Sequence, residues 1–147
     1  MRAEDVDAAM AIAGALAHAP HWPRSAYETV TAADGLQPRV ALVAEVAEGI
    51  AGIAVASVVA GTAELESIAV ARSAQRHGLA SALMATLIER VKAAGAGEMT
   101  LEVRASNRGA AAFYDRMGFL KVGIRPRYYR DPEEDAVILR LDLERAT

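Results

Sequence analysis

The sequence predicts a single α/β domain in which helices flank a mixed β-sheet. Helix-like segments alternate with short runs of β-branched residues, in the order helix, helix, three strands, helix, strand, helix, two strands. The chain has 147 residues, the length of one ordinary domain. Hydrophobic residues make up 53% of it and charged residues 24%, a balance that is typical of globular proteins.

The first two elements are predicted to be helices. Residues 4–17 are rich in alanine, the strongest helix former, and Pro20 and Pro23 end this pattern. Residues 25–33 form a second, shorter candidate helix before the turn signal Asp34-Gly35.

Three strands are predicted next. Residues 39–46 and 50–59 are rich in valine and isoleucine, and a turn at Glu48-Gly49 joins them. Residues 64–70 form the third strand. The hydrophobic period then changes, because Leu79 is followed by apolar residues at every fourth position up to Val91. This spacing predicts an amphipathic helix over residues 78–94, which Gly95 ends.

The last third of the chain is predicted to contain three strands and one helix. Residues 99–104 form a strand, after which Ser106 or Asn107 can cap a helix that ends at Gly118. The apolar side of this helix would carry Ala110, Phe113, Tyr114 and Met117. Two final strands cover residues 119–124 and 136–143.

Composition excludes several classes of site. Without cysteine, the chain has no disulfide, thiolate zinc site or cysteine nucleophile, and a reducing cytoplasm is the expected location. Acidic residues near the N-terminus do not suit a signal peptide, and the longest uncharged stretch, residues 49–61, is too short to span a bilayer. The net charge of -3 argues against nucleic acid as a partner but is compatible with a basic peptide.

A phosphate-binding loop is predicted where the third strand leads into the long helix. The run from Gln75 to Ala80 places small residues, Gly78 and Ala80, at the first helical turn. Free amides at a helix N-terminus bind phosphates, and Arg76 can add a charged contact. The segment is neither a P-loop nor a dinucleotide fingerprint. It resembles the pattern Gln/Arg-x-x-Gly-x-Gly/Ala, the acetyl-CoA pyrophosphate loop of GNAT acetyltransferases.

A second motif resembles one branch of that superfamily, the bacterial ribosomal-protein alanine N-acetyltransferases. The run Leu-Glu-Val-Arg-Ala-Ser-Asn ends at Asn107, Tyr114 precedes Gly-Phe, and Tyr128-Tyr129 precede Glu-Asp-Ala. His21-Trp22-Pro23 resembles the tryptophan-containing turn of the same branch. The resemblance covers about residues 22–141 and implies one GNAT domain over residues 1–147 with a central, mainly antiparallel sheet.

The resemblance also implies roles for individual residues. Glu102 would be the general base and Tyr114 the general acid, while Asn107 would hydrogen-bond acetyl-CoA, the cosubstrate. Backbone groups of Ile68, Ala69 and Val70 would contact the acetyl group and the pantetheine arm. The pyrophosphate would be held by Arg76, His77, Gly78, Leu79, Ala80 and Ser81. No metal site is implied.

The chemistry of acetyl transfer needs such a pair of groups. An α-amino group has a pKa of about 8 and must lose a proton to attack a thioester, and a carboxylate can accept that proton directly or through water. The departing thiolate needs a proton, which a tyrosine hydroxyl can supply. The lack of cysteine fits direct transfer without a covalent enzyme intermediate.

Each assignment has a structural alternative. Gly78 and Ala80 could serve helix-start packing alone, Glu102 could be a solvated residue paired with Arg104, and Tyr114 could be a core aromatic residue.

Further alternatives apply to the remaining candidates. Asn107 could be a helix cap, alone or in addition to binding, and Tyr128 and Tyr129 could anchor a loop or contact a peptide. His18 and His21 are spaced like metal ligands but have no carboxylate or thiol partner nearby in the sequence.

Three functions are compatible with the sequence. The first is acetylation of the N-terminal amine of a ribosomal protein or related peptide, for which Glu64, Glu66, Glu133 and Glu134 could favour a basic acceptor. The second is acetylation of a small amine or antibiotic. The third is a non-catalytic acyl-CoA-binding regulator, against which the presence of both Glu102 and Tyr114 argues.

Overall fold

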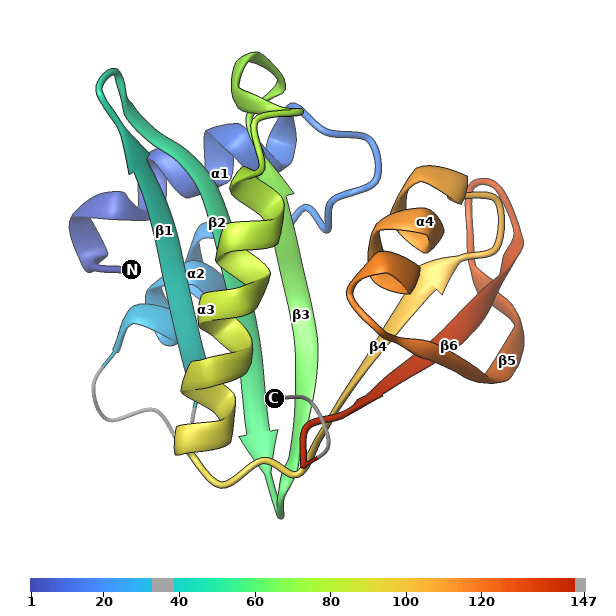
Figure 1. Ribbon diagram of the computed structural model, residues 1–147. Coiled ribbons are helices and arrows are strands. Elements are labelled where there is room, and N and C mark those ends of the chain that lie inside the picture. Colours follow the sequence, from blue (N-terminus) through green and yellow to red (C-terminus); the bar gives the residue numbers. More distant parts are fainter. Residues whose placement is uncertain (33–38, 145–147) are drawn as a thin grey trace.

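A six-stranded sheet with the order β1-β2-β3-β4-β6-β5 forms the centre of the computed structural model, which describes residues 1–32 and 39–144 (Figure 1). Its strands are β1 (Arg39–Val46), β2 (Gly49–Val59), β3 (Thr62–Val70), β4 (Glu98–Arg104), β5 (Leu120–Tyr129) and β6 (Glu134–Asp142). All neighbouring strands are antiparallel except β3 and β4, which are parallel. The prediction of a mixed, mainly antiparallel sheet is therefore confirmed.

Four α-helices and two short 3₁₀ helices accompany the sheet in the described part of the chain. They are η1 (Ala3–Asp5), α1 (Val6–Gly14), α2 (Arg24–Thr31), η2 (Arg72–Ala74), α3 (Leu79–Ala93) and α4 (Arg108–Arg116). Residues of α1 and α2, including Val6 and Tyr27, form one buried cluster with Ile53 and Ala69 of the sheet. Residues of α3 and α4, including Leu87 and Tyr114, join a second and larger cluster. The helices thus flank the sheet, as the sequence predicts.

The parallel pairing of β3 with β4 is short. It joins Thr62–Glu64 to Glu98–Thr100, and beyond that point the two strands separate (Figure 1). A bulge in β3 accompanies the separation, because Ser67 pairs with Val55 whereas Leu65 pairs with Ala56. The extra residue, Glu66, bends β3 at this position. The sheet is consequently split into a half with β1, β2 and β3 and a half with β4, β5 and β6.

Several element boundaries differ from the predicted ones. The first helix is shorter than residues 4–17, because η1 occupies its first turn and α1 ends at Gly14. Strand β5 extends to Tyr129 rather than ending at residue 124. Pro126 interrupts the apolar pattern there, but proline is tolerated because β5 is an edge strand. The predicted last residue of the second helix, Ala33, and the turn Asp34-Gly35 lie outside the described residues.

Candidate active site

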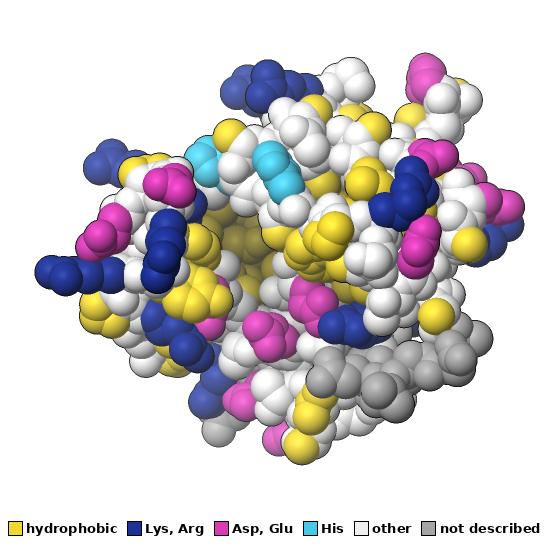
Figure 2. Space-filling view, turned by 180° about the vertical axis from the view of Figure 1, so that it is seen from behind, with side chains coloured by type: hydrophobic (Ala, Val, Ile, Leu, Met, Phe, Trp, Pro, Cys, Tyr) yellow, Lys and Arg dark blue, Asp and Glu magenta, His cyan; other side chains and the backbone are white. Residues whose placement is uncertain are grey.

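A cleft of about 760 Å³ opens where β3 and β4 separate, and it is called the strand cleft below. Its walls come from both strands, the start of α3, one side of α4 and the loop that follows α1. Figure 2 shows the molecule hollowed on one face, with hydrophobic side chains inside the hollow and acidic side chains along its border. The cleft lies between β3 and β4, because the two strands separate there and no other strand of the described chain lies between them.

The unpaired edge of β3 presents backbone groups to the strand cleft. The Ala71 amide donates to the Ala51 carbonyl over 2.8 Å, so Ala71 and, two residues earlier, Ala69 face β2. Ile68 and Val70 alternate with them and face the gap, and Gln75 Nε2 donates to the Val70 carbonyl over 3.0 Å from that side. Of the three predicted backbone contributors, Ile68 and Val70 have groups at the gap. Ala69 also lines the strand cleft, but its backbone N–H and C=O groups are directed to β2.

The predicted phosphate loop has the geometry of an anion site. Gly78 is the N-cap of α3 with φ +78°, and no side chain caps the helix there. The amides of Leu79, Ala80 and Ser81 therefore remain available in the first turn. Arg76 also has a positive φ, of 67°, and its side chain is exposed beside that of His77. Among these residues, Ala80 lines the strand cleft.

Glu102 lies on β4 at the opposite edge of the gap. Its Oε1 is 2.9 Å from Arg125 Nε, and its side chain is 23% exposed. Interaction with this carboxylate is the main reason why the pKa of the Tyr128 hydroxyl is raised. The sequence-based alternative that Glu102 pairs with Arg104 is wrong, because Arg104 turns to the β5–β6 hairpin instead.

Tyr114 is both a core residue and a cleft residue. It is 7% exposed and packs edge-on against Phe113 and Phe119, yet it lines the strand cleft. Burial, together with the nearby Tyr129, raises the pKa of its hydroxyl to about 12. Tyr114 therefore keeps its proton at neutral pH, as a hydrogen-bond donor must.

Alkaline unfolding should report on this buried hydroxyl. Folding raises the pKa of Tyr114 from an ordinary value of about 10 to about 12. The contribution of Tyr114 to the free energy of unfolding is complete below pH 10 and is lost as pH rises to 12, by up to roughly 3 kcal/mol in total. The free energy of unfolding, measured with urea, should therefore fall across this pH window by more in the wild type than in Tyr114→Phe. If the free energy of unfolding fell by the same amount in both proteins, the hydroxyl would ionise in the folded state as easily as in the unfolded state.

Asn107 is a helix cap, which is one of the two roles predicted for it. Its Oδ1 accepts a hydrogen bond from the Ala110 amide over 3.1 Å and so fixes the start of α4. Because Asn107 also lines the strand cleft, capping and contact with a bound molecule are compatible.

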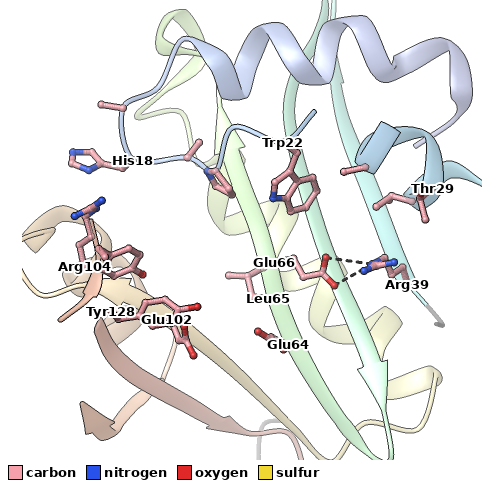
Figure 3. Close-up of a pocket in the computed structure, with 16 residues that line it drawn as sticks. His18, Trp22, Thr29, Arg39, Glu64, Leu65, Glu66, Glu102, Arg104 and Tyr128 are labelled. Atoms are coloured by element: carbon pink, nitrogen blue, oxygen red, sulfur yellow. Dashed lines mark hydrogen bonds and ion pairs between the residues drawn. The ribbon is translucent and has the colours of Figure 1, made fainter. Parts of the chain in front are cut away.

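A second cleft of about 700 Å³, called the loop cleft below, lies beneath the segment of residues 15–23. Trp22 and His18 border it from that segment, and Tyr128 borders it from β5 (Figure 3). Three carboxylates, from Glu64, Glu66 and Glu102, lie on its floor. The two clefts share a border formed by residues 17–20, Leu65, Glu66, Glu102, Arg104 and Tyr129.

The family follows from a comparison of the sequence with known proteins. Residues 9–119 match the profile of the acetyltransferase (GNAT) family. The chain belongs to the GNAT acetyltransferase family. A [ribosomal protein bS18]-alanine N-acetyltransferase of Escherichia coli strain K12 is 42% identical over 95 residues, which are 63% of this chain and 64% of that protein. The aligned part is thus less than two thirds of that relative's length.

Solved structures share the whole fold of this GNAT chain. The crystal structure of the ribosomal-protein-S18-alanine N-acetyltransferase from Escherichia coli matches with a TM-score of 0.82 and 31% identity, over 97% of this chain and 90% of that one. Naa20 from Chaetomium thermophilum, solved in complex with a bisubstrate analogue, matches with a TM-score of 0.84 and 26% identity, over 99% and 85%.

The candidate site also contains residues to which the sequence alone assigned no role. Arg125 reaches Glu102, and Arg39 Nε lies 3.1 and 3.3 Å from the two carboxylate oxygens of Glu66 (Figure 3). Ser67, beside the bulge, lines the strand cleft and has a buried hydroxyl without a hydrogen-bond partner in the described structure. Only the bulge and the strand register bring these residues to the site, and neither can be recognised from the sequence.

Residues 1–32 and 39–144 hold no cluster of side chains suited to bind a metal ion. His21 Nε2 instead lies 2.9 Å from the Leu16 carbonyl. None of the helices in this part of the chain is long and apolar enough to cross a bilayer.

Proposed function

We propose that the protein transfers the acetyl group of acetyl-CoA to the α-amino group of a peptide N-terminus, with the N-terminal alanine of a ribosomal protein as its acceptor. The observation that carries this proposal is the common border of the two clefts. A thioester in the strand cleft and an amine in the loop cleft would meet at Glu102, which lines both.

The donor side of this proposal rests on the loop before α3 and the open edge of β3. The first-turn amides of α3 would bind the pyrophosphate, with Arg76 adding charge. The pantetheine arm would run along the edge of β3, where the backbone groups of Ile68 and Val70 face the gap. An amide of this edge would polarise the thioester carbonyl and stabilise the negative charge that develops on its oxygen.

The acceptor ammonium must lose two protons in all: one before the attack, and a second from nitrogen as the C–S bond breaks, which passes to water or to the departing sulfur. The departing sulfur also needs a hydrogen bond. Glu102 would take a proton from the acceptor ammonium, directly or through water, so that the amine can attack the carbonyl carbon and expel sulfur. With a pKa of about 12, Tyr114 is a weaker acid than a cysteine-like thiol, whose pKa is about 8.5. Tyr114 would therefore stabilise the departing sulfur mainly by donating a hydrogen bond.

The shape of the loop cleft favours a peptide as acceptor. It lies between the residue 15–23 segment and the β5–β6 hairpin, and about half of the Tyr128 side chain is exposed beside it (Figure 3). The similarity to a ribosomal-protein-S18-alanine N-acetyltransferase over 97% of the chain supports the same acceptor class.

The test is a CoA-release assay with acetyl-CoA and a panel of acceptors, followed by mass spectrometry of the products. The panel holds peptides that copy ribosomal-protein N-termini, the same peptides with a blocked α-amine, polyamines and aminoglycosides. We expect acetylation of the free α-amine of alanine-initiated peptides and none of the blocked peptides. If only small amines were acetylated, the acceptor would be a small amine and not a peptide. Acetyl-CoA binding without any turnover would favour a non-catalytic regulator.

A further inference from the structure

Arg104, at the end of β4, makes most of its contacts with the turn between β5 and β6. Its Nη1 donates to the Pro132 carbonyl over 3.1 Å, and its Nη2 donates to the Arg130 carbonyl over 3.2 Å. Nη1 also lies 3.3 Å from Glu134 Oε1. The guanidinium carbon stands 4.4 Å from the centre of the Tyr129 ring. One side chain therefore holds both ends of the hairpin turn and the aromatic residue before it.

Glu134 extends this network toward α4. Its second carboxylate oxygen accepts a hydrogen bond from the Ser106 amide. Ser106 directly precedes Asn107, the cap of the helix that carries Tyr114. The pKa of Glu134 is lowered mainly by the side chain of Ser106, and the Ser106 amide and Arg104 lower it further. The carboxylate is therefore ionised at neutral pH and bridges the hairpin to the segment that leads into α4.

The part that Arg104 holds is a wall of the site. Tyr129 lines both the strand cleft and the loop cleft, and Tyr128 lines the loop cleft. The hairpin lies at the edge of the sheet, where β5 is the outermost strand (Figure 1). Little apolar burial fixes its position, since Tyr128 is 50% exposed. The network around Arg104 therefore has to supply the rigidity that packing does not.

We propose that Arg104 is a positioning residue for acetyl transfer, whose guanidinium holds residues 129–132 in place as the wall against which the acceptor peptide binds. This inference rests on the proposed function, because it assigns the wall to the acceptor. Arg104 does not need to touch the acceptor, since its donors are directed to the hairpin carbonyls and to Glu134.

The planar guanidinium is essential to this role. Arginine presents several fixed donors and a flat face that stacks on an aromatic ring, whereas lysine presents one compact ammonium. An ammonium can reach one or two of the carbonyls, but it cannot join both carbonyls, the carboxylate and the ring at once. Arg104→Lys thus keeps the charge and removes the simultaneous contacts.

The experiment compares Arg104→Lys with Arg140→Lys as a matched control. Arg140 lies on β6 of the same half-sheet and pairs with Glu98 at 3.3 Å, away from the hairpin turn. Two readouts are taken for each protein: steady-state kinetics with an alanine-initiated peptide, and amide hydrogen exchange over residues 127–135. For Arg104→Lys we expect the acceptor KM to rise about tenfold, with kcat and the acetyl-CoA affinity within about twofold of the wild type. Exchange in the hairpin should also become faster.

Each outcome decides the proposal. If hairpin exchange became faster but the acceptor KM stayed unchanged, Arg104 would have only a structural role. If kcat alone fell, Arg104 would not act through acceptor binding, and the proposal would be wrong. If the wild type acetylates no peptide, the proposed function fails. Unchanged hairpin exchange in Arg104→Lys would separately show that Arg104 does not hold the hairpin in place. Should Arg104→Lys not fold, Glu134→Gln removes the charge from the other side of the network. It should raise the acceptor KM in the same direction by a smaller factor.

Discussion

Glu102→Gln should lower kcat/KM for the acceptor by about a hundredfold at neutral pH, with acetyl-CoA bound as in the wild type. Glutamine keeps the shape of the side chain and can still accept a hydrogen bond from Arg125 or Tyr128, but it cannot take a proton. The acceptor ammonium must then lose its proton to solvent. The measurement is steady-state kinetics with an alanine-initiated peptide, together with direct titration of acetyl-CoA.

The pH dependence separates a base from a merely structural carboxylate. The α-amine has a pKa of about 8, so a growing fraction of acceptor is already neutral as pH rises past that value. The deficit of Glu102→Gln should therefore shrink on the alkaline side. Glu89→Gln, the same change on the exposed surface of α3, serves as control and should behave as the wild type. If the loss of kcat/KM in Glu102→Gln were equal at all pH values, the role of Glu102 would be to hold Arg125 and Tyr128 in place.

Much of the fold could be predicted because its signals are local in the sequence. The four-residue spacing of Leu79, Leu83, Leu87 and Val91 predicts α3, and these positions face the sheet, where Leu83, Leu87 and Val91 are buried in the larger core cluster. Strand β1 has the predicted bounds. The end of β5 was missed because Pro126 normally interrupts a strand, and only the position of β5 at the sheet edge makes it acceptable.

The candidate site could be predicted only where its residues belong to contiguous motifs. Ala80 of the predicted phosphate loop, Glu102 and Asn107 all stand in short runs of sequence, and all three line the strand cleft. The charge pairs across the site could not be predicted in the same way. Glu102 meets Arg125 because β4, β6 and β5 pair in a particular register, and register depends on tertiary packing.

The split of the sheet is the feature that sequence reasoning could least supply. It depends on one extra residue in β3, Glu66, opposite the Val55-Ala56 step of β2. The apolar alternation of β3 predicts a strand but does not mark this residue as a bulge, since a glutamate there also fits a solvated strand face. The open edge of Ile68 and Val70, on which the proposed donor site depends, follows from that irregularity.

Ala80→Glu should weaken acetyl-CoA binding by about a hundredfold, because like charges at a binding contact cost several kcal/mol. Ala80 is in the first turn of α3 and lines the strand cleft, where we place the pyrophosphate. A carboxylate in the first turn of a helix interacts favourably with the helix dipole, so this substitution should not weaken α3 itself. A loss of affinity with an unchanged unfolding midpoint would therefore report on the ligand. Isothermal titration with acetyl-CoA measures it.

Two further variants separate charge from bulk and position. Ala80→Gln has nearly the same size without the charge, so its affinity should lie between those of the wild type and Ala80→Glu. The excess loss in Ala80→Glu should diminish as salt concentration rises, because salt screens the repulsion. Ala85→Glu places the same carboxylate on the exposed side of α3, beyond the first turn, and should bind acetyl-CoA normally. Equal losses for Ala80→Gln and Ala80→Glu at all salt concentrations would mean that the pyrophosphate does not lie at the α3 terminus.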